Sequence, residues 1–117
     1  MSIDDLNKRI KRGESFIVAN DGQFLGKLCL NRYDVDSILN QYGPFGSAYS
    51  VTSIYNKYSI YGSPYSSLSP FNPYTSTPPN IYLRGIMIGV LSVNLYLYQS
   101  VDPNRIEEWM KSQNLYY

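Results

Sequence analysis

The residue types that most often carry out catalysis or bind metals are scarce in this chain. It has 117 residues, no histidine and a single cysteine, Cys29. Without histidine it lacks the commonest general base and the commonest metal ligand. One cysteine excludes an internal disulfide and a zinc site built from several thiolates. Any catalysis would therefore have to use tyrosine, carboxylate or lysine side chains.

The remaining reactive groups do not form a catalytic or metal-binding pattern. Lys27 precedes Cys29 by two residues and could lower the pKa of the thiol, but a buried, inert cysteine is the more frequent case. Asp34 and Asp36 resemble the start of a calcium loop, yet the glycine and glutamate required further along are missing. We therefore predict no catalytic residue, no bound metal and no cofactor, which indicates that the protein is not an enzyme.

Charge is low and unevenly distributed along the chain. Ten basic and nine acidic residues give a formal net charge of +1, so no binding to nucleic acid is expected. Between residues 37 and 79 the only charged side chain is Lys57. The longest apolar run, residues 86–98, is shorter than the roughly 20 residues of a membrane-spanning helix. No secretory signal is visible, which favours a cytoplasmic location and leaves the compartment open.

A sixteen-residue sequence repeat occupies the uncharged middle of the chain. From Ser37 the sequence reads SILNQYGPFGSAYSVT, then SIYNKYSIYGSPYSSL, then SPFNPYTSTPP. The dense Gly, Pro, Ser and Asn residues indicate turns, and the recurring aromatic residues argue against disorder. We predict an ordered loop-repeat array over residues 37–79. The residues that recur in register include Ser37, Ser53, Ser69, Asn40, Asn56, Asn72, Tyr42, Tyr58 and Tyr74.

A second repeat lies on either side of the first. Residues 21–33 (DGQFLGKLCLNRY) match residues 84–96 (RGIMIGVLSVNLY) at a constant offset of 63. Each copy follows a short β-prone run and a turn signal, so we predict two related β-hairpins, over residues 16–33 and 81–98.

The alternation of apolar residues in the two hairpins predicts which side chains face the core. Gly26 and Gly89 occupy matching positions, where a glycine within a strand indicates a bulge or a close backbone contact. The predicted core residues are Phe24, Leu28 and Leu30 in the first hairpin and Met87, Leu91, Val93, Leu95 and Leu97 in the second.

Short helices are predicted at both ends of the chain. Ser2 with Asp5 resembles a capping box for a helix over residues 1–12. Asp102, which precedes a proline, is a good start for a helix over residues 103–112. The predicted fold is a single, mainly β domain of the α+β class. Its two hairpins form a small sheet or barrel, and the array is inserted between them.

The repeat side chains are the candidates for a binding surface. Tyrosine and serine suit recognition, because tyrosine gives a large contact area at low entropic cost and serine gives hydrogen bonds. The alternative is that these residues have a purely structural role. In that case the asparagines are expected to cap backbone groups and the aromatic residues to fill a core. The predicted binding residues are Tyr42, Tyr49, Tyr58, Tyr61, Tyr65, Asn40 and Asn56.

The repeats resemble an uncharacterised family of small bacterial proteins with tandem S-I-x-N-x-Y-G-x-Y-G-S-x-Y-S units. The matching stretches are Asp21–Gly26, Ser37–Ser66 and Ser69–Pro79. The chain departs from the pattern at Pro44 and at Ser59, where the second copy lacks a glycine. The family has no established activity, so the resemblance implies relatives and no mechanism.

The low charge, the repeated tyrosines and the missing catalytic groups favour a non-catalytic interaction module. We expect it to bind a protein partner, or a second copy of itself as a homo-oligomer, through the Tyr/Ser-rich repeat surface. The alternative is a protein that binds a small ligand, either a glycan or a nucleotide-like molecule, in a cleft lined by aromatic residues.

Overall fold

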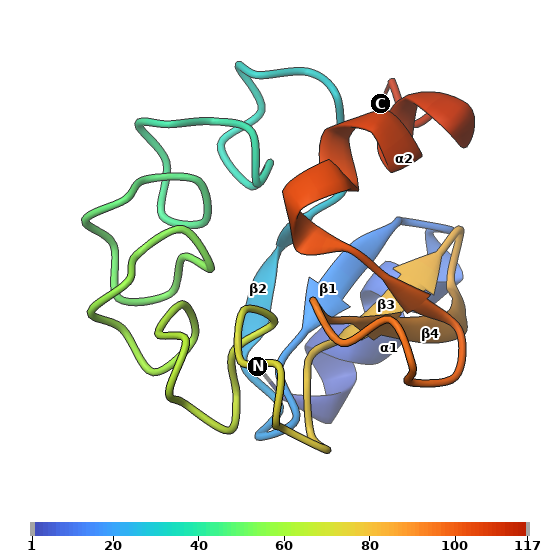
Figure 1. Ribbon diagram of the computed structural model, residues 1–117. Coiled ribbons are helices and arrows are strands. Elements are labelled where there is room, and N and C mark those ends of the chain that lie inside the picture. The colour runs from blue at the N-terminus through green and yellow to red at the C-terminus, as the bar shows by residue number, and fades with distance from the viewer. Residues whose placement is uncertain (1, 117) are drawn as a thin grey trace.

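The computed structural model describes residues 2–116, which form an α+β fold around one five-stranded sheet (Figure 1). The strands are β1 (Phe16–Val18), β2 (Phe24–Lys27), β3 (Asn80–Leu83), β4 (Ile86–Leu91) and β5 (Ser100–Val101). They lie in the order β2-β1-β3-β4-β5, and all neighbours are antiparallel except β4 and β5, which run parallel. The sheet is mixed and open, so of the two predicted forms, sheet and barrel, the structure has the sheet.

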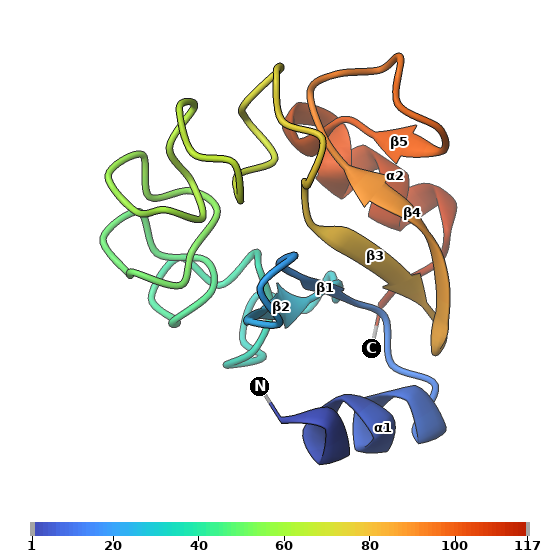
Figure 2. The ribbon, with the colours of Figure 1, turned by 90° about the horizontal axis from the view of Figure 1, so that it is seen from below.

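Helix α1 (Ile3–Lys11) covers one face of the sheet (Figure 2). It begins after Ser2, whose Oγ accepts the N–H of Asp5 at 3.2 Å, so the predicted N-terminal cap is confirmed. Two apolar residues of the helix, Leu6 and Ile10, hold it against the strands. They pack on a cluster of three buried side chains, Phe16, Val18 and Phe24.

The opposite face carries the 3-10 helix η1 (Pro103–Arg105) and helix α2 (Ile106–Ser112) (Figure 2). The carboxylate of Asp102 accepts the N–H of Asn104 at 2.9 Å, so the predicted start of this helical region is confirmed. Met110 of α2 is fully buried. Among the residues that the structure describes, neither α-helix has the length and apolar content needed to cross a bilayer.

The strands are shorter than the predicted hairpins. β2 ends at Lys27 and β4 ends at Leu91, and turns follow both. After β4 the hydroxyl of Ser92 accepts the N–H of Asn94 at 3.0 Å, and Asn94 Oδ1 accepts the N–H of Tyr96 at 3.1 Å. These side chains satisfy backbone donors that a strand would offer to its neighbour, so the chain turns instead of extending.

The predicted core face of the first hairpin is only partly correct. One step along β1 corresponds to two steps along β2, from Phe24 to Gly26, which makes Leu25 the extra residue of a β-bulge. Phe24 therefore lies in the cluster under α1, whereas Leu25 and Leu28 lie in the main core on the other face. Gly26, predicted to mark a bulge, has φ +126° there.

The antiparallel pair β3–β4 has the same kind of irregularity. One step along β3 corresponds to two steps along β4, from Met87 to Gly89. A Cβ on Gly89 would lie 2.1 Å from the carbonyl oxygen that precedes β5, so the predicted close backbone contact is confirmed. Leu91 is buried as predicted, but Met87 and Leu95 are 53% and 62% exposed, because the bulge and the turns after β4 break the alternation.

A long segment of turns connects β2 to β3 and lies beside the sheet (Figures 1 and 2). We call residues 31–77 the turn segment. Near its start, the N–H of Lys27 donates to the carbonyl oxygen of Asp36 at 2.7 Å. Near its end, the carbonyl oxygen of Pro70 accepts the N–H of Val93 at 2.9 Å. Both ends of the turn segment are therefore hydrogen-bonded to the sheet region.

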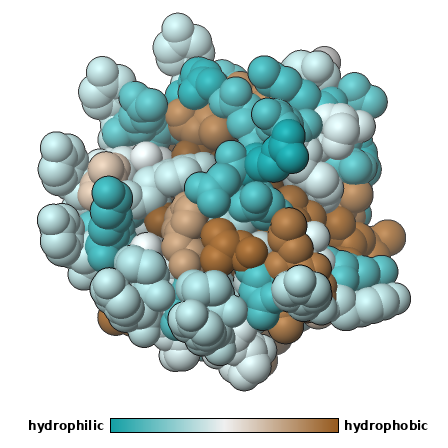
Figure 3. Space-filling view, viewed as in Figure 1, coloured by the Kyte–Doolittle hydropathy of each residue, from teal (hydrophilic) through white to brown (hydrophobic). Residues whose placement is uncertain are grey.

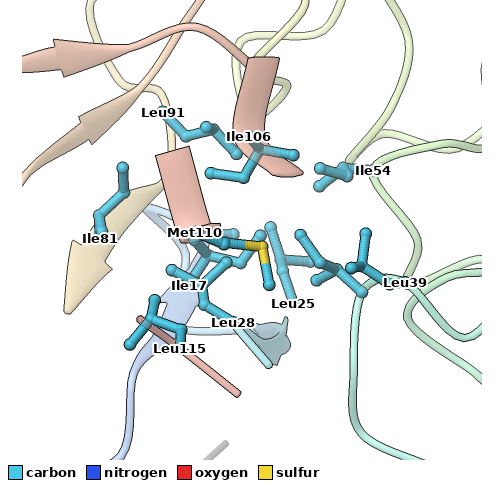
Figure 4. Packing of buried hydrophobic residues seen from close by; sticks show 12 residues of the cluster. Ile17, Leu25, Leu28, Leu39, Ile54, Ile81, Leu91, Ile106, Met110 and Leu115 are labelled. Carbon is cyan, nitrogen blue, oxygen red and sulfur yellow. The ribbon is translucent and has the colours of Figure 1, made fainter. Parts of the chain in front are cut away.

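The main core lies between the sheet, α2 and the turn segment (Figure 4). Leu39 and Ile54 enter it from the turn segment, so this segment is part of the packed fold. The labelled core residues are Ile17, Leu25, Leu28, Leu39, Ile54, Ile81, Leu91, Ile106, Met110 and Leu115.

Candidate binding surfaces of the turn segment

The turn segment consists of consecutive three-residue turns. The N–H that opens each turn donates to the carbonyl oxygen three residues earlier, at 3.0–3.4 Å, in most of the segment. The side-chain oxygen of the first residue also accepts the N–H two residues later. Most turns are thus closed twice, as in Asx- and ST-turns, and an exception is the turn that begins at Gly43. These first residues are Asn31, Asp34, Ser37, Asn40, Ser47, Ser50, Ser53, Asn56, Ser59, Ser63, Ser66, Ser69, Asn72 and Thr75.

Two glycines interrupt the three-residue spacing at corresponding places. Gly46 and Gly62 each add one residue, and the next N–H donates four residues back, from Ser47 to Gly43 and from Ser63 to Ser59. Five three-residue turns and one glycine together make up the sixteen residues of the sequence period. The sixteen-residue sequence period is therefore built from turns of three residues each, a spacing that we call the three-residue rule.

Residues sixteen apart have matching environments on the outside of the segment. Six tyrosines are 91–98% exposed, and they fall into two sets that we call the tyrosine rows. The first row is Tyr42, Tyr58 and Tyr74, and the second is Tyr33, Tyr49 and Tyr65. Side chains project along the outer rim of the turn segment, on the left of Figure 3.

The inside of the segment also repeats every sixteen residues. Ile38, Ile54 and Pro70 are almost completely buried. The residues that follow them, Leu39, Tyr55 and Phe71, all contact the main core. The turns 37–39, 53–55 and 69–71 thus face the core, while other turns of the segment carry the exposed tyrosines.

Four of the predicted binding residues are exposed, and three have partners within the protein. Tyr42, Tyr49, Tyr58 and Tyr65 belong to the tyrosine rows. Tyr61 is partly buried, and its hydroxyl donates to Asp21 Oδ2 at 2.8 Å. The remaining two predicted residues are Asn40 and Asn56.

The two asparagines bind the backbone of the turn segment itself. The Nδ2 of Asn56 donates to the carbonyl oxygen of Ser50 at 3.0 Å, and its Oδ1 accepts the N–H of Tyr58 at 3.0 Å. Asn40 makes the same two bonds, to the carbonyl of Asp34 and to the N–H of Tyr42. Both side chains therefore occupy the capping role that was the alternative to ligand binding.

Two exposed tyrosines were not among the predicted binding residues. Tyr33 lies sixteen residues before Tyr49, and Tyr74 lies sixteen residues after Tyr58. Tyr74 already stands in register with Tyr42 and Tyr58, and extending the repeat by one step toward the N-terminus would have found Tyr33.

A groove separates the turn segment from η1 and α2. It contains two adjoining cavities of about 730 and 560 Å³, which share Tyr55, Phe71 and Asn104 as wall residues. Arg32 and Glu107 line the larger cavity and form an ion pair. Burial and the negative charge of Glu107 raise the pKa of Tyr55 to about 12, although the positive charge of Arg32 acts to lower it. The phenol of Tyr55 is therefore a neutral hydrogen-bond donor at physiological pH. We call this feature the central groove.

The groups considered above for catalysis or metal binding have structural partners. Lys27 Nζ lies 3.0 Å from Asp34 Oδ2. Partial burial acts to raise the pKa of Asp34. The hydrogen bonds from the N–H of Asp36 and the ammonium of Lys27 outweigh burial, so this pKa lies below its usual value. Cys29 is buried. Within residues 2–116 no cluster of three or more acidic or cysteine side chains is placed to hold a metal ion.

Comparison with known proteins finds no match to a family model, to a curated protein or to a solved structure. The resemblance of the repeats to a bacterial family therefore stays a prediction from the sequence. The function has to be argued from the geometry of the turn segment and of the central groove.

The Tyr61–Asp21 hydrogen bond gives a prediction about alkaline pH. Partial burial, the hydrogen bond to Asp21 and the negative charge of Asp21 raise the pKa of Tyr61 from 10.0 to about 12. Because the folded state holds this proton more tightly than the unfolded chain does, the stabilisation is fully present below about pH 10. It is lost as the pH rises toward about 12, and we expect the free energy of unfolding to fall over that range.

Urea denaturation at a series of alkaline pH values measures this loss, and two variants assign it. Tyr61→Phe removes the ionising group, so its stability should fall less steeply than that of the wild type. Asp21→Asn keeps the Oδ1 acceptor for the N–H of Gln23 but removes the charge, and should be intermediate. Tyr55 and Lys27, whose pKa values are also raised, account for the remaining loss. An unchanged slope in Tyr61→Phe would contradict the assignment.

Proposed function

We propose that this protein is a non-catalytic interaction module that binds a protein partner, or a second copy of itself, through the tyrosine rows. The observation that carries the proposal is the near-complete exposure of six tyrosines in one segment. Tyrosine supplies a large, rigid contact area with a polar end at low entropic cost, and is therefore enriched at recognition surfaces.

We propose further that the turn segment is a repeat array in which each sixteen-residue stretch adds one tyrosine to each row. The matching environments of residues sixteen apart support this. The antiparallel pairs β1–β2 and β3–β4 support the idea that the two flanking sequence repeats are related hairpins. Kinship with the bacterial family that the repeats resemble is part of the same proposal.

The backbone of the turn segment favours binding without a large ordering cost. The turns that carry the tyrosines are fixed by a backbone hydrogen bond and by a side-chain acceptor, so the bases of the tyrosine side chains are held in place before a partner arrives. Preorganisation of this kind raises affinity by reducing the conformational entropy lost on binding.

The charge of the segment favours a protein surface over a nucleic acid. Lys57 is the only charged residue from 37 to 79. Binding to a phosphate backbone depends on several cationic side chains and the counterions that they displace. A neutral surface of phenols and hydroxyls lacks that interaction but complements the mixed apolar and polar surface of a protein.

Removing one tyrosine row tests the proposal. The variant Tyr42→Ser/Tyr58→Ser/Tyr74→Ser deletes exposed rings only, so its free energy of unfolding should change little. A matched control, Tyr96→Ser/Tyr98→Ser, removes exposed tyrosines that lie outside the turn segment. Sedimentation velocity over a wide concentration series measures self-association, and calorimetry with any purified partner measures heterotypic binding.

We expect the wild type to associate. The affinity should be weakened at least about tenfold, or about 1.4 kcal/mol, in the row variant and should be unchanged in the control. Equal weakening in both variants would indicate a general loss of tyrosine contacts and would contradict a role for the rows. A wild type that stays monomeric and binds no protein through the rows would also contradict the proposal.

A further inference from the structure

The central groove has walls of a different character from the tyrosine rows. Leu39, Tyr55 and Phe71 form its wall on the turn segment, and Pro103 and Ile106 face them from η1 and α2. Hydrophobic side chains reach the surface in the middle of Figure 3, between the turn segment and the polar patch at the upper right. The volume of each cavity lies within the range of small-molecule sites, roughly 300–1,000 Å³.

Three uncharged polar groups line this groove. Within residues 2–116, the hydroxyl of Tyr55 and the side-chain amides of Gln41 and Asn104 make no hydrogen bond. Gln41 and Asn104 are exposed and Tyr55 is partly buried, so a ligand in the groove can bind all three groups in place of water. Unused donors and acceptors beside aromatic walls are the features that orient a ligand in a mostly apolar cleft.

The two charged side chains that line the larger cavity form an ion pair, whereas Lys57, which lines the smaller cavity, makes no ion pair within residues 2–116. Arg32 pairs with Glu107, and Lys111 Nζ also lies 3.6 Å from Glu107. The larger cavity therefore offers no free charge for a strongly ionic ligand. A ligand of the larger cavity gains no ion pair there, so it needs an apolar face for the rings and several hydroxyl groups for the amides and the phenol.

We infer that the central groove binds a neutral carbohydrate. A sugar ring presents C–H groups on its face and hydroxyls around its edge, which matches the aromatic walls and the three uncharged polar groups. Two adjoining cavities give room for an oligosaccharide rather than a single sugar. The site is separate from the first tyrosine row, whereas Tyr49 of the second row lines the larger cavity.

An NMR titration of the isotopically labelled full chain tests the inference. The probes are neutral oligosaccharides derived from cellulose, chitin and starch, and a nucleoside monophosphate serves as the charged comparison. Tyr55→Phe keeps the ring and removes one hydroxyl, and Asn104→Ala removes one exposed amide. The matched controls are Tyr58→Phe and Asn7→Ala, which remove the same groups from exposed sites outside the groove.

We expect at least one oligosaccharide to give saturable shifts at residues of the groove. Its affinity should fall at least about fivefold in each groove variant, as loss of one hydrogen bond implies, and stay unchanged in each control. Absence of saturable binding by every oligosaccharide would overturn the inference, as would equal affinities in the groove variants and the controls. Binding of the nucleotide alone would replace carbohydrate by a nucleotide-like ligand. Removing the first tyrosine row, Tyr42, Tyr58 and Tyr74, leaves this result unchanged, so failure here is distinguishable from failure of the proposed interaction module.

Discussion

Replacing Gly62 with alanine is expected to lower the free energy of unfolding by at least about 3 kcal/mol, more than most single substitutions. A Cβ at this position would lie 2.1 Å from the carbonyl oxygen of Asn56 and 2.7 Å from that of Ile54. The Asn56 carbonyl cannot move away without cost, because it accepts the N–H of Ser59 at 3.1 Å. A Cβ on Gly46, sixteen residues earlier, would lie 2.1 Å from the Asn40 carbonyl oxygen, so Gly46→Ala should respond in the same way.

Urea denaturation followed by circular dichroism measures this change. Gly13→Ala is the control, because Gly13 has φ +68° but no atom within 4 Å of an added Cβ. It should cost only the conformational penalty of about 1–2 kcal/mol. A Gly62→Ala variant that loses no more stability than Gly13→Ala would show that the turns do not approach each other as closely as described.

The substitution Asn56→Ala is expected to cost about 3 kcal/mol. It removes the donor to the Ser50 carbonyl and the acceptor for the Tyr58 N–H together, and each group left without a partner costs about 1–3 kcal/mol. Asn56 is 7% exposed, so water replaces these bonds poorly. Asn56→Asp should be intermediate, because its carboxylate still accepts the Tyr58 N–H but can no longer donate to Ser50.

The control for Asn56 is Asn7→Ala on the exposed surface of α1, which should change stability by no more than about 0.5 kcal/mol. Thermal and urea unfolding of the three variants give the comparison. If Asn56→Ala resembles Asn7→Ala, the asparagine is not a structural cap, and a ligand-binding role for it becomes the better explanation.

Local signals in the sequence were sufficient for the helix starts and the turn between β3 and β4. Ser2 and Asp102 cap the predicted helical regions, because a cap depends only on residues within one turn. The extent of the strands could not be predicted in this way. Ser92 looks like part of an alternating strand, and only its hydrogen bond to the Asn94 N–H ends the pairing.

The three-residue rule of the turn segment was present in the sequence but hidden by the longer period. A polar residue at every third position is its signal. A second signal is proline, since Pro44, Pro64, Pro70 and Pro73 all occupy the second position of a turn, where no N–H is needed and φ near −65° fits. The extra glycines at 46 and 62 shift the count and leave sixteen as the visible period.

The candidate sites show the same division between local and distant information. The exposure of Tyr58 follows from its place in the repeat, and so does the capping role of Asn56. Tyr61 was predicted to be on the surface, but it binds Asp21, forty residues away in the chain. The central groove needs α2 opposite the turn segment, an arrangement set by tertiary packing that no local pattern of residues encodes.

The hydrogen bonds at the two ends of the turn segment restrict how its length can change. Asp36 is tied beside the edge strand β2, and Pro70 is tied to the chain just beyond β4. Inserting one more sixteen-residue stretch would lengthen the segment while its attachment points stayed fixed. The width of the sheet thus limits the number of tyrosines that the turn segment can carry. A longer turn segment would need a wider sheet, or the hydrogen bonds at one of its ends would have to break.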